Sequence, residues 1–324
     1  MRSKVIIAGL ILMIVTASQP YEPRSLPMTP AGGATVTCRC RIVWVAIEDG
    51  QRIVRVNIDS RRITKRAAVP GKPHNLTISS TGDTVATALW NAGRIAILRA
   101  GQVKGVALGG APHDVKIDGG RVVVANQTEA RLDLVSTTGK FLRSIALKAD
   151  PHDLALRRNG SQAWVTLEGS DDMAVVNIPE RSVRYMSTGK APHDLLFAPD
   201  GKLWVSDWHG AIHVFSRRGR LVKSIPLGVE AHHLDFTPDG RQVWITDHGA
   251  HRIFVVNTNT YNVRKRLSIA GAPHHIAITP DGDRAVVADH DRGVIVVYNV
   301  NRLRQVFTIK VGAGPHGIWA MPDL

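Results

Sequence analysis

The chain has 324 residues and a formal net charge of +14 at pH 7, and its only two cysteines are Cys38 and Cys40. Two cysteines so close together on one extended segment cannot easily reach disulfide geometry. This excludes a fold held together by disulfides and favours incidental thiols over a soft-metal or redox pair. The positive charge favours anionic partners such as nucleic acid, acidic polysaccharide or lipid headgroups.

Residues 1–20 have the three regions of a secretory signal peptide. Arg2 and Lys4 precede an unbroken apolar run over residues 5–15, and small residues follow. The run is too short to span a bilayer comfortably, so we expect no membrane span, and a net charge of about +12, once the signal is removed. Residues 21–37 are rich in Pro, Gly and Thr and predict a flexible lead-in. The N-terminal sequence therefore predicts a bacterial protein that is secreted, periplasmic or held in the cell envelope.

A short element built on a Pro-His pair recurs along the rest of the chain. The copies read KPHNLTIS (72–79), APHDVKID (111–118), DPHDLALR (150–157), APHDLLFA (191–198), EAHHLDFT (230–237), APHHIAIT (272–279) and GPHGIWAM (314–321). Their histidines are separated by 39, 39, 41, 39, 42 and 42 residues, and only the copy with Ala231 lacks the proline.

Each repeat contains short β-rich runs separated by turn signals, with no helical periodicity between them. The unit over residues 193–231 shows four such runs, DLLFA, LWVSD, AIHVFS and LVKSIPL. Four strands in about 40 residues is typical of a propeller blade. The sequence therefore predicts an all-β fold, a seven-bladed β-propeller with four antiparallel strands per blade.

The two ends of the repeat region complement each other. The last copy stops after a single strand, whereas residues 41–71 supply RIVWVAI, RIVRVNI and RITKRAAV without a first strand. We expect the C-terminal strand to lie innermost in a blade whose other strands come from the N-terminus, which leaves no open sheet edge at the seam. Residues 38–324 are thus predicted to form one propeller.

The repeat motifs resemble those of known propeller families. Pro-His-x-Leu/Ile, followed by Pro-Asp-Gly and LWVSD, resembles the YVTN-type seven-bladed propeller repeats of exported bacterial proteins. NAGRIAIL (91–98) and PDGKLWVSD (199–207) also resemble virginiamycin B lyase. The resemblance covers nearly all of the chain after about residue 40 and is specific for the fold, but propellers host unrelated activities.

Most histidines of the chain are predicted to gather on one face. The loop that enters the innermost strand and the loop that joins the second and third strands lie on the same face of a blade, because each strand reverses direction. These loops hold twelve of the fourteen histidines, all but His213 and His251. The candidate binding residues among them are Asp114, Asp153, Asp194, Trp208, His209, His233, Asp247, His275 and Asp289.

The repeated histidines have two interpretations. In the first, they make the same junction bond in every blade, and apolar residues two and four places later, such as Leu195 and Phe197, share their face of the strand. In the second, they converge on the channel as metal ligands, with acidic partners that orient them. The cofactor would be a divalent transition metal (Cu, Zn or Fe) or Mg. The candidate ligands are His74, His113, His152, His193, His232, His274 and His316.

The last three full blades depart most from the repeat. The motifs DWHG (207–210), DHGAH (247–251) and DHD (289–291) place an aspartate one or two residues before a histidine. Such a histidine is a candidate general base. The resemblance to the lyase implies that His248 or His290 is the base, with Glu168, Asp247 or Asp289 near a magnesium-type ion. The glutamate usual after the LWFT motif of that family is Asp207 here.

The tryptophans and the basic residues complete the candidate surfaces. Trp44, Trp164, Trp204 and Trp244 fall at one position of the second strand and predict packing between blades, whereas Trp90 and Trp208 fall in the loops at the candidate site. Basic runs at 61–66, 217–220 and 264–266 predict a basic exterior.

Three functions follow from these features. The leading prediction is an exported, monomeric propeller that binds a small-molecule or metal ligand at its histidine-rich axial face. The second is an enzyme that uses the same face, either a lyase like the streptogramin-linearising one or a metal-dependent oxidoreductase or lactonase. The third is a binding module for an anionic polymer or nucleic acid, whose affinity would fall with salt.

Overall fold

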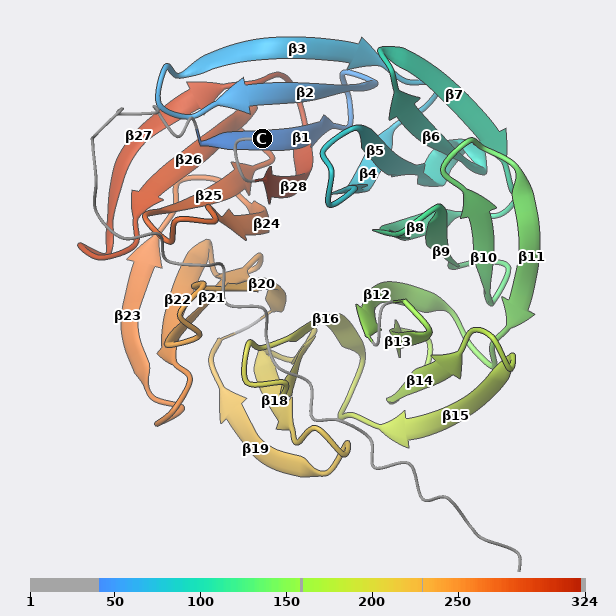
Figure 1. Ribbon diagram of the computed structural model, residues 1–324. Coiled ribbons are helices and arrows are strands. Elements are labelled where there is room, and N and C mark those ends of the chain that lie inside the picture. The colour runs from blue at the N-terminus through green and yellow to red at the C-terminus, as the bar shows by residue number, and fades with distance from the viewer. Residues whose placement is uncertain (1–40, 158–159, 229, 322–324) are drawn as a thin grey trace, which may run out of the picture. The chain divides into compact units, whose positions relative to one another are not determined.

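The computed structural model describes residues 41–157, 160–228 and 230–321. The predicted signal peptide (1–20), the lead-in (21–37), Cys38 and Cys40 lie outside the described residues. Within the described part, seven four-stranded antiparallel sheets stand around a central channel (Figure 1). The predicted seven-bladed propeller is confirmed.

Each blade has its innermost strand at the channel and its last strand at the rim (Figure 1). Blade 1 contains β28 (Pro315–Met321), β1 (Ile42–Ile47), β2 (Arg52–Asn57) and β3 (Arg62–Ala68). Blade 2 contains β4 (Pro73–Ile78), β5 (Thr84–Leu89), the short 3-10 helix η1 (Trp90–Ala92), β6 (Arg94–Arg99) and β7 (Gln102–Ala107). Blade 3 contains β8 (Pro112–Asp118), β9 (Arg121–Asn126), β10 (Arg131–Ser136) and β11 (Phe141–Ala146). Blade 4 contains β12 (Pro151–Arg157), β13 (Gln162–Leu167), β14 (Asp172–Asn177) and β15 (Ser182–Ser187). Blade 5 contains β16 (Pro192–Phe197), β17 (Leu203–Asp207), β18 (Ala211–Phe215) and β19 (Leu221–Pro226). Blade 6 contains β20 (Ala231–Phe236), β21 (Gln242–Asp247), β22 (Arg252–Asn257) and β23 (Val263–Ser268). Blade 7 contains β24 (Pro273–Ile278), β25 (Arg284–Asp289), β26 (Val294–Asn299) and β27 (Arg304–Lys310).

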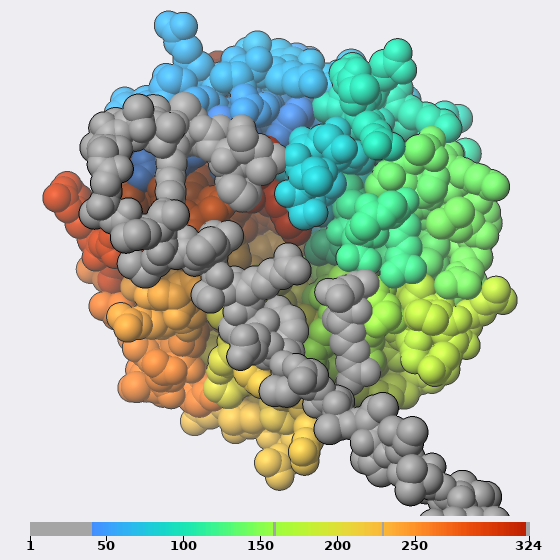
Figure 2. Space-filling view, in the orientation of Figure 1, coloured from blue at the N-terminus to red at the C-terminus, as the bar shows by residue number. Residues whose placement is uncertain are grey.

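The seam of the ring lies in blade 1, as predicted. Strand β28 pairs antiparallel with β1, with Trp319 opposite Trp44. In the space-filling view the blue and red ends of the propeller meet side by side (Figure 2). Because β1 is paired on both sides, the seam presents no unpaired strand edge to solvent.

The blades pack face to face through apolar side chains of the middle strands. Valine, isoleucine and alanine dominate these strands and are almost completely buried. Such β-branched residues suit a pleated surface covered on both faces. The four tryptophans predicted to pack between blades are buried in these layers, which confirms their role: Trp44, Trp164, Trp204 and Trp244.

Every innermost strand carries a β-bulge at its Pro-His element. In blade 5, Pro192 lies opposite Asp207 and Leu195 lies opposite Val205, so two residues share one partner. The same shift occurs in all seven blades. A bulge shifts the alternation of side chains by one residue. The prediction that His193 shares a face with Leu195 is therefore wrong, because the imidazole turns to the channel while Leu195 packs between blades.

Hydroxyl groups opposite three of the bulges join neighbouring blades. The Oγ1 of Thr166 accepts the N–H of Asp153 (3.0 Å) and donates to the carbonyl of His193 in the next blade (2.6 Å). The same bonds recur at Ser206 and Thr246 in blades 5 and 6. The junction bond of these repeats is therefore made by the backbone carbonyl of the repeated histidine.

Candidate functional site

The repeated histidines form a closed ring of imidazoles around the channel. We call it the histidine ring, and it consists of His74, His113, His152, His193, His232, His274 and His316. The centroids of neighbouring imidazoles are 3.7 to 5.2 Å apart around the whole ring. All seven predicted metal-ligating histidines are therefore brought together.

The Nδ1 atoms of the histidine ring are almost all without a partner. In His74, Nδ1 lies 3.1 Å from the amide oxygen of Asn75. The Nδ1 atoms of the other six histidines are buried and have no hydrogen-bond partner. Buried polar atoms without partners are uncommon and costly, because folding removes them from water without compensation. Six of them in one ring make this part of the channel a candidate binding site.

A second ring of polar side chains follows directly along the innermost strands. It consists of Asn75, Asp114, Asp153, Asp194, His233, His275 and Gly317, the residues that come after the repeated histidines. The amide Nδ2 of Asn75 donates to Asp153 Oδ1 (2.7 Å), and its Oδ1 lies 2.7 Å from His275 Nε2. His233 Nδ1 lies 3.2 Å from Asp194 Oδ2. Five predicted binding residues, Asp114, Asp153, Asp194, His233 and His275, thus lie together in the channel.

Asp153 has a carboxylate oxygen without a hydrogen-bond partner. Its Oδ2 is buried and has no hydrogen-bond partner, and the side chain as a whole is only 3% exposed. The Nδ1 atoms of His152, His193 and His233 lie 3.4, 3.8 and 3.9 Å from this oxygen. His113 Nδ1 lies 3.7 Å from the other oxygen. None of these contacts is a hydrogen bond, although the atoms lie close together.

The spacing of these atoms is equal to or somewhat wider than that of ligands around one metal ion. A tetrahedral ion with bonds of about 2.0–2.1 Å separates its ligand atoms by about 3.4 Å. Three groups of ligand atoms, each within 4.8 Å of one another, overlap here: His113 with His152 and Asp153; His193 with His232 and His233; Asp153 with Asp194 and His233. Imidazole and carboxylate donors suit zinc, copper or iron, whereas magnesium prefers oxygen ligands alone.

The electrostatics of the channel keep most imidazoles neutral. Burial lowers the pKa of His274 to about 3 and holds the pKa values of the other histidines in this group below the ordinary value: His74, His113, His193, His232, His233, His275 and His316. Burial also lowers the pKa of His152, but the carboxylates of Asp153 and Glu168 outweigh it and leave this pKa raised. For Asp153, burial is outweighed by the imidazoles of His152 and His113, so its pKa lies well below the usual range. An ionised carboxylate among neutral imidazoles is the protonation state that metal binding requires.

A ring of loop residues lies over the histidine ring. Each member follows the second strand of its blade, and the ring consists of Glu48, Trp90, Gln127, Glu168, Trp208, His248 and His290. Glu48 accepts a hydrogen bond from Trp90 Nε1 (2.6 Å). Glu168 accepts one from Trp208 Nε1 (2.6 Å) and one from Gln127 Nε2 (2.8 Å). The predicted binding residue Trp208 also contacts the histidine ring, at 4.4 Å from His193 between ring centroids.

The two candidate catalytic histidines lie in this loop ring. The centroids of His248 and His290 are 4.7 and 4.8 Å from that of His274. His248 Nδ1 lies 3.3 Å from a carboxylate oxygen of Glu230, and His290 Nε2 lies 3.5 Å from one of Glu48. The hydrogen bond to Glu48 raises the pKa of His290. Both imidazoles therefore face a glutamate from another loop, and Glu230 was not among the residues predicted from the sequence.

The aspartates at the ends of the second strands shape their own loops. Asp207 Oδ1 accepts the backbone N–H groups of His209 (2.9 Å) and Ala211 (2.8 Å). Asp247 and Asp289 likewise accept backbone N–H groups. The side chain of His209 is exposed. Of the predicted binding residues, Asp247, Asp289 and His209 are not gathered at the channel axis with the two rings.

His213, which the sequence left outside the site, belongs to a polar chain across blade 5. Its Nε2 lies 2.8 Å from Asp207 Oδ2 and its Nδ1 lies 2.9 Å from Ser224 Oγ. This is the residue set of a serine hydrolase triad. Blade 3 has a chain at the equivalent positions, formed by Asn126, Asp133 and Ser144. The chain in blade 3 lacks the histidine that a hydrolase triad needs. Its recurrence without this residue indicates that such chains stabilise the blade.

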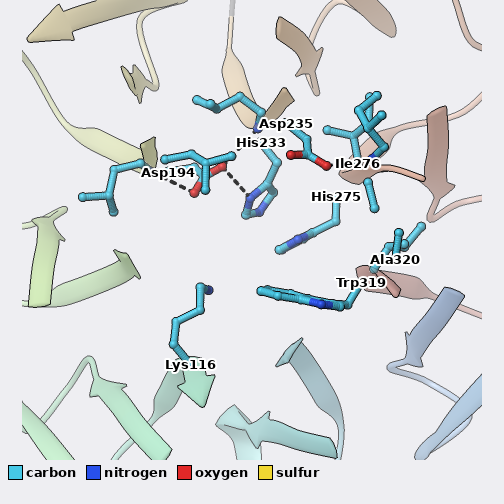
Figure 3. Close-up of a pocket in the computed structure, with 14 residues that line it drawn as sticks. Lys116, Asp194, His233, Asp235, His275, Ile276, Trp319 and Ala320 are labelled. Atoms are coloured by element: carbon cyan, nitrogen blue, oxygen red, sulfur yellow. Dashed lines mark hydrogen bonds and ion pairs between the residues drawn. The ribbon is translucent and has the colours of Figure 1, made fainter. Parts of the chain in front are cut away.

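A pocket of about 350 Å³ lies in the channel beyond the second ring (Figure 3). We call it the channel pocket. Its polar lining includes Asp194, His233 and His275 together with Lys116 and Asp235, and Trp319 forms part of its wall. Lys116, Asp235 and Trp319 were not predicted. Each lies three residues after a repeated histidine, a position that faces the channel only because the bulge shifts the alternation.

The predicted basic residues lie on the rim of the propeller. Those at 62–66 on β3 and at 264–266 on β23 are exposed lysines and arginines. The binding of an anionic polymer to this exterior stays a prediction. In the described part of the chain, no helix is long and apolar enough to cross a membrane.

The fold and the site define a seven-bladed propeller with a histidine-lined channel. The family model of the YNCE-like beta-propeller matches residues 118–323, which is more than half of the chain, and the chain belongs to this family. No curated protein sequence matches it.

Solved structures with the same fold include two enzymes. The periplasmic gluconolactonase of Pseudomonas aeruginosa is 17% identical, with a TM-score of 0.72 over 87% of this chain and 99% of that chain. A catalytically inactive virginiamycin B lyase from Staphylococcus aureus, solved with quinupristin, is 15% identical, with a TM-score of 0.68 over 78% of this chain and 92% of that chain. At these identities the likeness shows the fold alone.

Proposed function

We propose that this protein is an exported propeller that binds a divalent transition metal ion in its channel, with His113, His152 and Asp153 as ligands. His193 and His233 lie within reach as further ligands. The observation that carries the proposal is the unpaired Oδ2 of Asp153, surrounded by unpaired imidazole nitrogens at ligand spacing. The donor set favours zinc, copper or iron. The lowered pKa values of His113 and Asp153 support the proposal, whereas the raised pKa of His152 means that the metal ion displaces a proton from this ligand where it is charged.

Metal titration of purified protein tests this function. Chelator-treated protein, titrated with Zn²⁺ and Cu²⁺ against a chromophoric chelator, should bind at least one ion per chain. Asp153→Asn and His152→Gln should each weaken this binding by about tenfold or more, because each removes one ligand atom. His213→Gln, which removes a hydrogen-bonded imidazole outside the channel, is the matched control and should bind as the wild type does. A wild-type chain that binds no ion, or equal losses in all three variants, would refute the proposal.

Export is the second part of this proposal. It is supported by the charged, apolar and small-residue regions of residues 1–20 and by the fold similarity to a periplasmic gluconolactonase. N-terminal sequencing of protein isolated from the host's cell envelope and culture medium should find a chain that lacks these residues. An intact N-terminus on protein that stays in the cytoplasm would contradict export.

Catalysis at the mouth of the same channel is a second candidate function. The observation that favours it is His290, whose pKa is raised by Glu48 and which lies over the histidine ring. An imidazole whose pKa is raised by a carboxylate at a channel mouth is a candidate general acid or base. Hydrolysis of gluconolactone and linearisation of quinupristin are the assays to run. Turnover that is lost in His290→Gln would support this candidate, and the absence of turnover on both compounds would count against it.

A further inference from the structure

The channel pocket combines an apolar wall with a polar floor. Ile276, Ile278 and Ile318 line it together with Trp319, and Figure 3 shows Trp319 and His275 reaching toward its middle. Its volume of about 350 Å³ lies within the range of about 300–1,000 Å³ found for small-molecule sites. The floor consists of Asp194 and His233, which belong to the same polar ring as Asp153. A molecule in the pocket would therefore lie beside the proposed metal ion.

Lys116 supplies the positive charge of this pocket. Among the described residues that line it, Lys116 is the only lysine or arginine. Its Nζ donates to both carboxylate oxygens of Asp114, at 2.7 and 2.6 Å, which leaves one of its three N–H groups. The side chain of Lys116 is 23% exposed whereas that of Asp114 is 0% exposed. The pair thus presents its ammonium end to the pocket.

The carboxylates that line the pocket are engaged by the backbone. Asp194 accepts the N–H groups of Leu195 (2.7 Å) and Leu234 (3.0 Å). Asp235 accepts those of Phe236 (2.8 Å) and Ile278 (2.7 Å). Because these oxygens are directed into backbone bonds, they offer few acceptors to a bound cation. Two groups remain that can bind a ligand here. The unpaired N–H of Lys116 can donate a hydrogen bond, and the proposed metal ion can accept a ligand atom.

We infer that the channel pocket binds a small organic anion with a flat apolar body, the class of an aromatic monocarboxylate. Its carboxylate pairs with Lys116 beside the metal ion, and its flat body packs against Trp319 and the isoleucines. This inference rests on the proposed metal binding for the second charge that attracts the anion.

Calorimetric titration with three isosteric probes tests the inference. Zinc-loaded protein is titrated with benzoate, benzamide and benzylammonium, which share a ring and differ in charge. Benzoate should bind at least about tenfold more tightly than the other two, because only it brings a negative charge to the ammonium of Lys116, whereas benzamide offers a neutral carbonyl oxygen and benzylammonium a like charge. Equal affinity for benzoate and benzamide, or tighter binding of benzylammonium, would overturn the inference.

Two substitutions and two matched controls assign the binding to this pocket. Lys116→Met and Trp319→Leu should each weaken benzoate binding by about tenfold. Lys148→Met removes a lysine that is ion-paired with Asp172 away from the channel, and Phe141→Leu removes an exposed aromatic ring on the rim strand β11. Both controls should leave benzoate binding unchanged. Undiminished binding in Lys116→Met would overturn the inference.

Folding and metal content are measured on the same samples. If Lys116→Met does not fold because Asp114 is left unpaired, the double variant Asp114→Asn with Lys116→Met removes both charges and should show the same loss of benzoate. Benzoate binding that depends on Lys116 in protein without metal would support the pocket and overturn the part assigned to the metal ion in attracting the anion, while the metal titration decides the metal site separately. Metal-loaded protein that binds none of the three probes would refute the pocket and leave the metal site standing.

Discussion

Asp153 differs from the other two aspartates of the second ring because it lacks one hydrogen bond from the backbone. Asp114 and Asp194 each accept the N–H of a leucine on the next blade, Leu154 and Leu234, both at 3.0 Å. The equivalent donor for Asp153 is the N–H of Leu195, which instead donates to Asp194. Asp153 therefore keeps one carboxylate oxygen free for another partner. Among the aspartates at this position of the repeat, it is the one whose carboxylate can bind a cation in the channel.

The pair formed by Glu48 and His290 gives a prediction at the same scale. Glu48→Gln should lower the pKa of His290, because the hydrogen bond to the Glu48 carboxylate is the largest cause of its raised value. The change is read from the pH titration of the His290 imidazole signal in NMR spectra. Asp291→Asn is the control and should shift the pKa less, since Asp291 acts on His290 only through space. An unchanged pKa in Glu48→Gln would contradict the role assigned to this pair.

The β-bulge of each innermost strand positions the residues of the candidate site. It brings two consecutive residues of each innermost strand to the channel, so the histidine ring and the second ring lie one above the other. In blades 4 to 6 a hydroxyl forms hydrogen bonds with both the bulge and the next blade. A local irregularity thus sets both the ligand geometry and the junction between blades.

Removal of one such hydroxyl should destabilise the propeller. Thr166→Val keeps the shape of the side chain but leaves the N–H of Asp153 and the carbonyl of His193 without this partner. We expect a loss of about 1–3 kcal/mol in the free energy of unfolding, the usual cost of unsatisfied buried polar groups. Urea denaturation measures it, with Thr308→Val on the exposed face of β27 as a control that changes little. Equal stability of the two variants would show that the hydroxyl bond contributes nothing.

The sequence predicts the blades well because their signal repeats. The spacing of the Pro-His elements, the turn residues and the incomplete ends predict the blade number and the seam, and all are confirmed. The bulge leaves no such signal, so simple alternation puts the histidines on the wrong face and misses Lys116 and Trp319. Asp153 and Asp194 each follow a Pro-His pair, so the sequence around them looks the same. They differ because the N–H of Leu195 donates to Asp194 and not to Asp153.

At the scale of the whole molecule, ring closure gathers many imidazoles in one buried channel, which makes stability sensitive to acid. Eight histidines have pKa values lowered by burial below the 6.5 of an unfolded chain, and two, His152 and His290, have raised values. Below pH about 6.5 the unfolded chain binds more protons than the folded one at the eight lowered sites. Stability is therefore lost as the pH falls from about 6.5 toward the folded values, and the raised sites, which are these two histidines and the buried Asp114, Asp194 and Asp235, oppose this only in part.

Denaturation of metal-free protein at several pH values checks this prediction. Each lowered histidine contributes up to about 1.4 kcal/mol per pH unit, so the urea midpoint should drop steeply between about pH 6.5 and pH 5. Saturation with zinc should raise the midpoint, because the ion binds only the folded chain. A midpoint that stays constant over this pH range would contradict the neutral, buried state of the ring.

Anomalous X-ray diffraction at the zinc absorption edge, from crystals of zinc-loaded protein, tests the central claim most directly. We predict a peak in the channel, about 2.0–2.2 Å from Asp153 Oδ2 and from the Nδ1 atoms of His113 and His152. Peaks only at the loop histidines His248 and His290 or on the outer surface, with none in the channel, would contradict the proposal that the histidine ring and Asp153 form a metal centre.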